Sequence, residues 1–152
     1  MSVLSLAGTY RVKGKYVSYD DNTDTNANIH HPVNIPSQKV VITQNGRFFT
    51  YKVEDETTQP KLGVLTRVEF QGELLGWQAY LVGTQNDNQV SVFSFIKVNN
   101  NQVCQFELSI LEAGYDEGNA ADWFPVVRSN GRALTSIIRR DYAGTRGSDW
   151  GR

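Results

Sequence analysis

Hydrophobic and polar residues alternate with period two along most of this chain, and that alternation predicts β-strands. In residues 8–17, for example, tyrosine and valine side chains alternate with arginine and lysine. Runs of the same kind follow over residues 39–44, 47–53, 62–71, 74–82, 90–98, 103–111 and 132–140. The pattern therefore predicts an all-β protein with eight strands.

Short turn sequences separate three pairs of these strands and predict β-hairpins. Asn45-Gly46 suits a type I′ turn, Gly72-Glu73 suits a type II′ turn, and residues 99–102 form a polar turn. Each turn implies a register for the strands beside it. The expected pairs are Ile42 with Phe49, Phe70 with Leu75, and Val98 with Val103.

Strands that follow one another in this way form a mostly antiparallel meander, which exposes two edges unless it closes. Eight strands are enough for a small closed barrel, so we expect an up-and-down β-barrel, with a two-sheet β-sandwich as the alternative. We expect one domain over residues 1–140 and a polar tail over residues 141–152. The polar stretch 18–37 is expected to be a loop, and one short helix is expected near residues 117–124.

The hairpin of residues 90–111 is apolar on both faces of its first strand. One face is expected to belong to the core and carries Phe93, Phe95, Cys104, Phe106, Leu108 and Ile110. The opposite face of the first strand carries Val90, Val92, Ile96 and Val98. A second apolar face on one strand indicates that another surface covers it. These four residues are therefore candidates for contact with a partner.

The segment Leu6-Ala7-Gly8-Thr9-Tyr10 resembles the Gly-x-Trp opening of lipocalins and the Leu-x-Gly-Thr-Trp opening of avidin-like proteins. The eight-strand meander and the insertion before the last strand are also similar to this calycin group, in which Tyr10 would replace the tryptophan. The resemblance implies a β-barrel. In the family an arginine near the barrel end packs on the tryptophan, which implies that Arg139 or Arg140 packs on Tyr10.

The net charge, the apolar runs and the cysteine count of the chain indicate which kinds of partner and which cellular compartment to expect. The 152-residue chain has a net charge of −1, so no overall field attracts nucleic acid or an anionic membrane. No apolar run approaches the ~18 residues that a membrane-spanning helix needs. The N-terminus has no basic flank, so we expect no secretion signal and cytoplasmic synthesis. The single Cys104 excludes an internal disulfide framework.

Few residues suit catalysis or metal binding. His30 and His31 are adjacent in a polar stretch and have no third ligand at a suitable spacing. The acidic clusters 54–56 and 116–117 are more typical of solvated loop charge than of paired carboxylates or a calcium site. The chain also lacks a nucleophile motif and a phosphate-binding glycine loop. We therefore expect no catalytic residue, metal site or cofactor.

Aromatic residues have two interpretations. Those in the strands either line a cavity for a small apolar ligand or fill the barrel, and they are Tyr10, Tyr16, Phe49, Tyr51, Phe70, Trp77 and Phe106. Side chains often fill barrels of eight strands, which favours a packed core. Trp123, Phe124 and Trp150 lie outside the strands and are candidates for contact with a partner; the alternative for Trp123 and Phe124 is a plug at one barrel end.

The sequence leaves three hypotheses of function. The first is a non-catalytic structural or interaction protein, a β-barrel subunit of a homo-oligomer or of a larger assembly such as a virus particle. It rests on the two-faced strand, the balanced charge and the missing catalytic set. The second is a calycin-like protein that binds a small apolar ligand in the barrel. The third is a small-barrel enzyme that catalyses an isomerisation or cyclisation with few polar residues.

Overall fold

The computed structural model describes residues 3–21, 27–29, 32–55, 57–82, 89–116, 128–129 and 132–147. These residues form one sheet, and none of them lies in an α-helix. The all-β prediction is confirmed. The short helix expected near residues 117–124 falls outside the described ranges.

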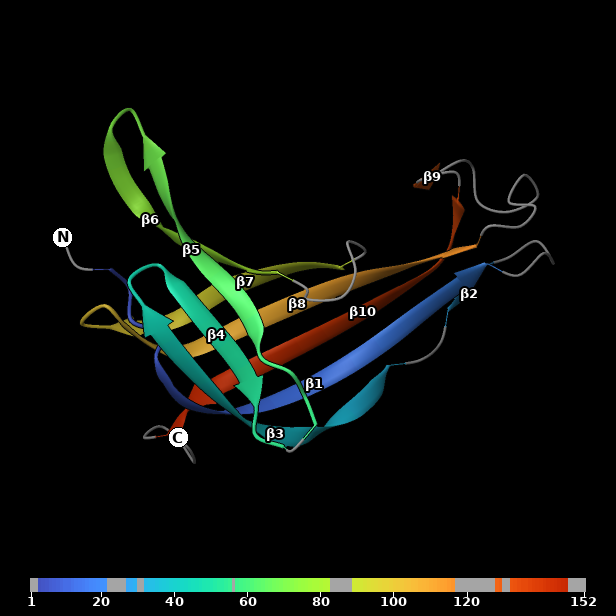
Figure 1. Cartoon of the computed structure of the whole chain (residues 1–152), viewed down its shortest axis with the longest axis horizontal. Helices are drawn as coiled ribbons and strands as arrows, with labels where there is room; N and C mark the ends of the chain where they lie inside the picture. Colours follow the sequence, from blue (N-terminus) through green and yellow to red (C-terminus); the bar gives the residue numbers. More distant parts are fainter. Residues whose placement is uncertain are drawn as a thin grey trace.

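The sheet contains eight long strands and two short ones. In chain order they are β1 (Gly8–Asp21), β2 (Ala27–Ile29), β3 (Val33–Asn45), β4 (Phe48–Val53), β5 (Lys61–Phe70), β6 (Glu73–Val82), β7 (Gln89–Asn99), β8 (Gln102–Asp116), β9 (Arg128–Ser129) and β10 (Arg132–Arg146). Each long strand pairs with the next long strand, and β1 also pairs with β10 (Figure 1).

The pairing of the first and last long strands closes the sheet into a ring. The β1–β10 ladder runs from Tyr10 opposite Arg146 to Asp20 opposite Ser136. Because β1 pairs with β3 on its other side, neither β1 nor β10 leaves an open edge along this ladder. The predicted closed meander of eight antiparallel strands is confirmed, and the two-sheet sandwich is not formed.

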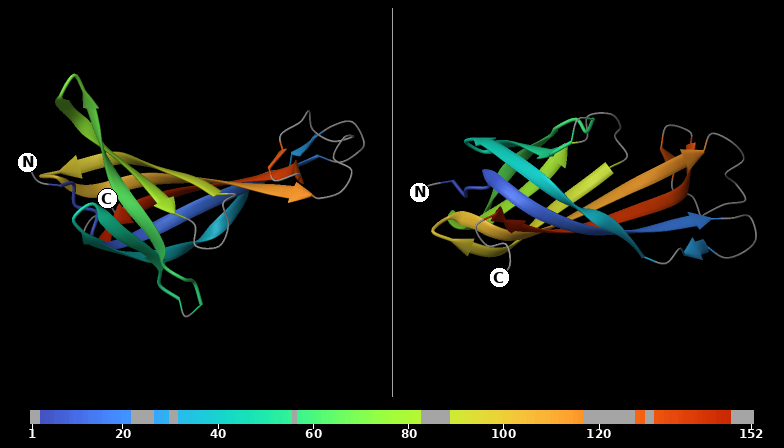
Figure 2. Two further views of the ribbon diagram at one scale, coloured as in Figure 1. Left: turned by 45° about the horizontal axis from the view of Figure 1, so that its top comes forward. Right: turned by 90° about the horizontal axis from the view of Figure 1, so that it is seen from below.

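The ring is uneven. Strands β1, β8 and β10 are 14 or 15 residues long, whereas β4 has 6 residues. The long strands extend beyond the ring toward β2 and β9, and the β5–β6 hairpin projects away from it (Figure 1, Figure 2). The ring is therefore tightly closed along only part of its length.

Two stretches that the sequence predicted as irregular are strand. The loop predicted over residues 18–37 is wrong at both ends of that stretch, because β1 continues to Asp21 and β3 begins at Val33. The predicted tail is also partly strand, since β10 continues to Arg146. In both places the backbone pairs with a neighbouring strand, and these backbone hydrogen bonds do not require apolar side chains.

Two of the three predicted hairpin registers are shifted. In the β3–β4 hairpin Asn45 pairs with Phe48, so the turn residues are Gly46, with a φ of +61°, and Arg47. Ile42 therefore lies opposite Tyr51 rather than Phe49. In the β5–β6 hairpin the two turn residues are Gln71 and Gly72, and both have positive φ, as a type I′ turn requires. There Phe70 lies opposite Glu73 rather than Leu75.

The third register is confirmed, with Val98 opposite Val103. Asn100 and Asn101 have φ values of +51° and +61° and form the turn. Two register shifts before Val98, one with Ile96 as the extra residue on β7 and one with Cys104 as the extra residue on β8, change the alternation, so that both Val103 and its neighbour Cys104 are buried.

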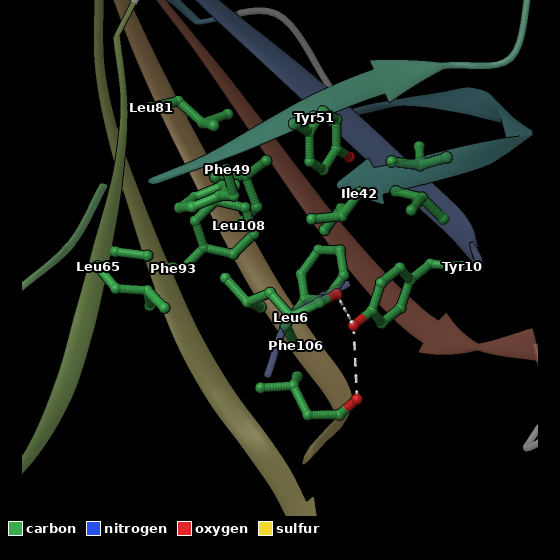
Figure 3. Packing of buried hydrophobic residues seen from close by; sticks show 14 of the residues in the cluster. Leu6, Tyr10, Ile42, Phe49, Tyr51, Leu65, Leu81, Phe93, Phe106 and Leu108 are labelled. Carbon is green, nitrogen blue, oxygen red and sulfur yellow. Dashed lines mark hydrogen bonds between the residues drawn. The ribbon is translucent and has the colours of Figure 1, made fainter. Parts of the chain in front are cut away.

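Buried aromatic rings fill the interior at one end of the ring (Figure 3). Tyr10 and Phe106 meet edge to face with their ring centroids 5.0 Å apart. A Cβ on Gly144 would collide with the Phe106 ring, and a Cβ on Gly63 would collide with the Phe49 ring. Glycine at these two strand positions therefore lets the rings lie directly against the backbone.

The N-terminal segment covers this filled end of the core. Leu4 and Leu6 are buried. Between them, the Ser5 amide donates to the Asn101 carbonyl at 2.6 Å, and the Val103 amide donates to the Ser5 carbonyl at 2.9 Å. The segment is thus bonded to the β7–β8 turn and to the start of β8.

The contact between β6 and β7 is the weakest part of the ring. Its ladder has one residue pair, Ala79 opposite Phe93. Beside it, the buried Ser91 hydroxyl accepts a hydrogen bond from the Leu81 amide at 2.7 Å and donates one to the Leu81 carbonyl at 3.0 Å. One side chain therefore replaces part of the backbone ladder here.

Replacing this hydroxyl is expected to weaken the ring. Ser91→Ala leaves the two backbone groups of Leu81 without these partners and should lower the free energy of unfolding in urea by about 1–3 kcal/mol. The control Ser94→Ala, at an exposed position of the same strand, should change it by less than about 0.5 kcal/mol. Equal losses in the two variants would contradict the role of Ser91.

Candidate functional site

At the filled end of the core, Arg146 of β10 forms hydrogen bonds with the N-terminal segment, β1 and β8. This buried guanidinium donates to the Val103 carbonyl at 2.7 Å, the Ala7 carbonyl at 2.8 Å and the Tyr10 hydroxyl at 2.7 Å. The Tyr10 hydroxyl in turn donates to the Leu6 carbonyl (Figure 3). The guanidinium carbon also lies 4.9 Å from the centre of the Tyr10 ring, within cation–π range.

The arginine that packs on Tyr10 is therefore neither Arg139 nor Arg140. The β1–β10 register places Arg146 opposite Tyr10, and the other two arginines lie further along the strand. Gly8 belongs to the same arrangement, since it has a φ of +149° and a Cβ there would collide with Arg146.

The seven aromatic residues considered for a ligand cavity do not line one cavity. Tyr10, Phe49, Tyr51 and Phe106 are buried, and the four form edge-to-face contacts with one another or with Phe93. The other three are outside this cluster or at its margin: Tyr16 is 38% exposed, Phe70 is 64% exposed, and Trp77 is partly buried. Most of the predicted lining is thus core or surface.

A cavity of about 190 Å³ lies at the other end of the core from Arg146. Its apolar wall comes from Val53, Leu108 and Ile110, and Tyr51 is the one predicted aromatic residue that reaches it. The remaining lining residues are polar: Gln38, Thr58, Gln59, Lys61 and Tyr142. The sequence did not indicate them because they come from β3, the β4–β5 connection, β5 and β10, which the closed ring brings together.

Lys61, which lines this cavity, and Glu112, which acts on Lys61, have shifted pKa values. Burial lowers the pKa of the Lys61 ammonium, and the nearby Arg140 lowers it further, whereas Glu112 opposes the shift. The hydrogen bond from Arg140 to Glu112, at 2.7 Å, lowers the pKa of that carboxyl. Burial raises the pKa of both Tyr51 and Tyr142. Both tyrosines therefore keep their protons at neutral pH.

A larger groove, of about 730 Å³, lies on the outer side of β1, β8 and β10. Its lysines and Arg139 are interleaved with Glu107 and Asp141. Asp141 is already engaged, since it pairs with Arg139 at 3.0 Å and accepts a hydrogen bond from Ser109 at 2.8 Å. The mixed charges do not select one ligand chemistry.

The predicted contact residues of β7 are exposed, as expected. Val90 is 60% exposed, Val92 44%, Ile96 56% and Val98 44%. On the opposite side of β7, Phe93 is buried and Phe95 is partly buried against the core, which confirms that this strand is apolar on both faces.

Neighbouring strands extend this exposed surface into a larger one, here called the apolar face. Pairing places Leu62 beside Val82 and Val64 beside Tyr80, while Val90 lies beside Leu111. The antiparallel register of Ala79 with Phe93 brings the β6 and β7 residues next to each other. The apolar face consists of Phe48, Leu62, Val64, Tyr80, Val82, Val90, Val92 and Leu111.

Several sequence predictions fall outside the described ranges, including those on Trp123, Phe124, Trp150, His30 and His31. Among the residues described, no three or more His, Cys, Asp or Glu side chains are grouped in a way that could hold a metal ion. In the same ranges no helix has the length and apolar character needed to cross a membrane.

Removing the Arg146 guanidinium should cost much more than removing an exposed one. Arg146→Met leaves the buried Val103 carbonyl, the partly buried Ala7 carbonyl and the Tyr10 hydroxyl without this donor, and we expect a loss of about 2–4 kcal/mol in the free energy of unfolding. Arg139→Met breaks only an exposed ion pair with Asp141 and should cost less than about 1 kcal/mol. Chemical denaturation of both variants measures the difference. Similar losses would show that the hydrogen bonds of Arg146 contribute no more to stability than an exposed ion pair.

Ionisation of Tyr10 should lower the free energy of unfolding at alkaline pH. Burial raises the pKa of its hydroxyl to about 12, although Arg146 beside it acts in the opposite direction. The unfolded chain ionises this group near pH 10, so the stabilisation is complete below pH 10 and is lost as the pH rises toward 12. Unfolding measured over this range should therefore show a shallower pH dependence in Tyr10→Phe than in the wild type, whereas parallel curves would refute the assignment.

Comparison with known proteins found no relative of this chain. No family model matches the chain, and neither a curated protein nor a solved structure matches it. Function must therefore be inferred from the geometry of the chain.

Proposed function

We propose that this chain is a non-catalytic structural subunit that associates with further copies of itself through the apolar face. The observation that supports the proposal is the continuity of that face over five strands, β4 to β8. Seven of its eight side chains are between 40% and 68% exposed. Soluble monomers rarely leave so many adjacent large apolar side chains in water.

The chemistry of the face suits a second copy of the same surface. None of its eight residues is charged, so two copies brought together bury no like charges. Leu111 lies opposite Arg139 in the sheet, and Arg139 is ion-paired with Asp141 at the margin. An uncharged centre with a charged margin is the usual anatomy of a protein interface.

The energy available is sufficient for association. Complete burial of a valine, leucine or phenylalanine side chain contributes about 1.5–3 kcal/mol. The cost of joining two molecules is about 4–15 kcal/mol, so several half-exposed side chains buried together can outweigh it. Two sheets can pack face to face in this way, and a two-fold axis would let the same patch serve on both copies.

The alternative, a calycin-like protein that binds a small apolar ligand, has less support. Tyr10, Phe49 and Phe106 would have to line its cavity, but they pack against other side chains in the core. No observation on the described residues favours the third hypothesis, an isomerase or cyclase.

A charge placed in the middle of the apolar face should prevent association. Val90→Lys is expected to shift sedimentation from a concentration-dependent oligomer to a monomer, because the lysine would be desolvated without a partner.

Val33→Lys is the matched control, because Val33 is 45% exposed on β3, away from this face. It should leave the oligomer intact, and circular dichroism should show the same fold in all variants. A wild type that stays monomeric at submillimolar concentration, or equal effects of Val33→Lys and Val90→Lys, would refute the proposal.

A further inference from the structure

We infer that the cavity beside Lys61 binds a small organic anion, a monocarboxylate with a compact apolar body. This site is independent of the apolar face. Three features of the cavity and its surroundings indicate this ligand. They are hydrogen-bond donors without partners among the described residues, a nearby carboxylate already bound by an arginine, and an apolar part of the lining.

The donors at the cavity lack partners. Among the residues that the structure describes, neither the Lys61 ammonium nor the hydroxyls of Tyr51 and Tyr142 have a hydrogen-bond or ion-pair partner. All three residues line the same cavity, and Tyr51 lies opposite Lys61 in the β4–β5 ladder. A partly buried ammonium without a counter-ion is unfavourable, so an acceptor in the cavity would stabilise it.

The electrostatics favour an anion over a neutral ligand. Glu112 lies near Lys61, but its carboxylate is bound by Arg140 at 2.7 Å and by the Gln89 amide at 3.2 Å. Among the described charges that act on Lys61, Lys61 and Arg140 are positive and Glu112 is negative, so one positive charge is left over beside the cavity. Two protonated tyrosines add donors and no charge, a set that suits the two oxygens of a carboxylate.

The wall and the volume restrict the ligand to a small, partly apolar molecule. The apolar part of the lining comes from Val53, Leu108 and Ile110. The volume of about 190 Å³ is below the roughly 300–1,000 Å³ of pockets for drug-sized ligands. It corresponds to roughly six waters. A single ring or a short branched chain that carries one carboxylate fits these limits.

Benzoate is a suitable probe, with benzyl alcohol as its neutral counterpart and inorganic phosphate as an anion without an apolar body. In calorimetric titrations of the full chain at neutral pH, benzoate should bind saturably. Benzyl alcohol and phosphate should each bind at least about tenfold more weakly, which corresponds to the loss of about one charge-assisted contact or of the apolar contacts.

Variants locate the site. Lys61→Met should weaken benzoate binding at least about tenfold, and Tyr51→Phe should weaken it by a smaller factor. Lys39→Met is the control, since Lys39 is half exposed in an ion pair with Glu54 outside the cavity, and it should bind benzoate as the wild type does. Val90→Lys should also bind normally, which separates this site from association.

Three outcomes would overturn the inference. The first is no saturable benzoate binding by the folded wild type. The second is equal binding of benzyl alcohol, or tighter binding of phosphate, because the ligand class would then be wrong. The third is unchanged benzoate affinity in Lys61→Met, provided that circular dichroism shows the wild-type fold, because the anion would then bind elsewhere.

Discussion

The hydrogen bonds of Arg146 are the interaction on which the arrangement of the ring depends. A buried guanidinium is tolerated only when its donors have acceptors, and here the acceptors come from the N-terminal segment, from β1 and from β8. The β1–β10 register places Arg146 opposite Tyr10, where its guanidinium reaches all three acceptors. One side chain thus couples closure of the sheet, position of the N-terminal segment and packing of the aromatic core.

This constraint explains why the two ends of the core differ. At the Arg146 end, Tyr10, Phe106 and the N-terminal leucines fill the interior. Toward the other end, the lining changes to Tyr142, Lys61 and glutamines, and a cavity remains. On the outside, apolar side chains of β4 to β8 lie side by side and are exposed. The proposed roles in association and in anion binding use these two separate regions.

Alternation of side chains was sufficient to predict the eight strands, the closed meander and the two faces of β7, because these features depend on local period and strand number. The registers of two hairpins were not predictable from alternation, since they depend on which residues adopt positive φ, namely Gly46 in one turn and Gln71 with Gly72 in the other. The role of Arg146 and the cavity at Lys61 were missed for a different reason. Both depend on contacts between strands far apart in the chain, and the sequence contains no local signal of which strand ends meet.

Association through the apolar face is tested most directly by methyl NMR spectra recorded at increasing protein concentration. If the face associates, the methyl signals of Val82, Val90 and Leu111 should shift or broaden as the concentration rises, while those of the buried Val12 and Val40 stay constant. Changes confined to methyl groups on another surface, or no concentration dependence in any methyl signal, would contradict it.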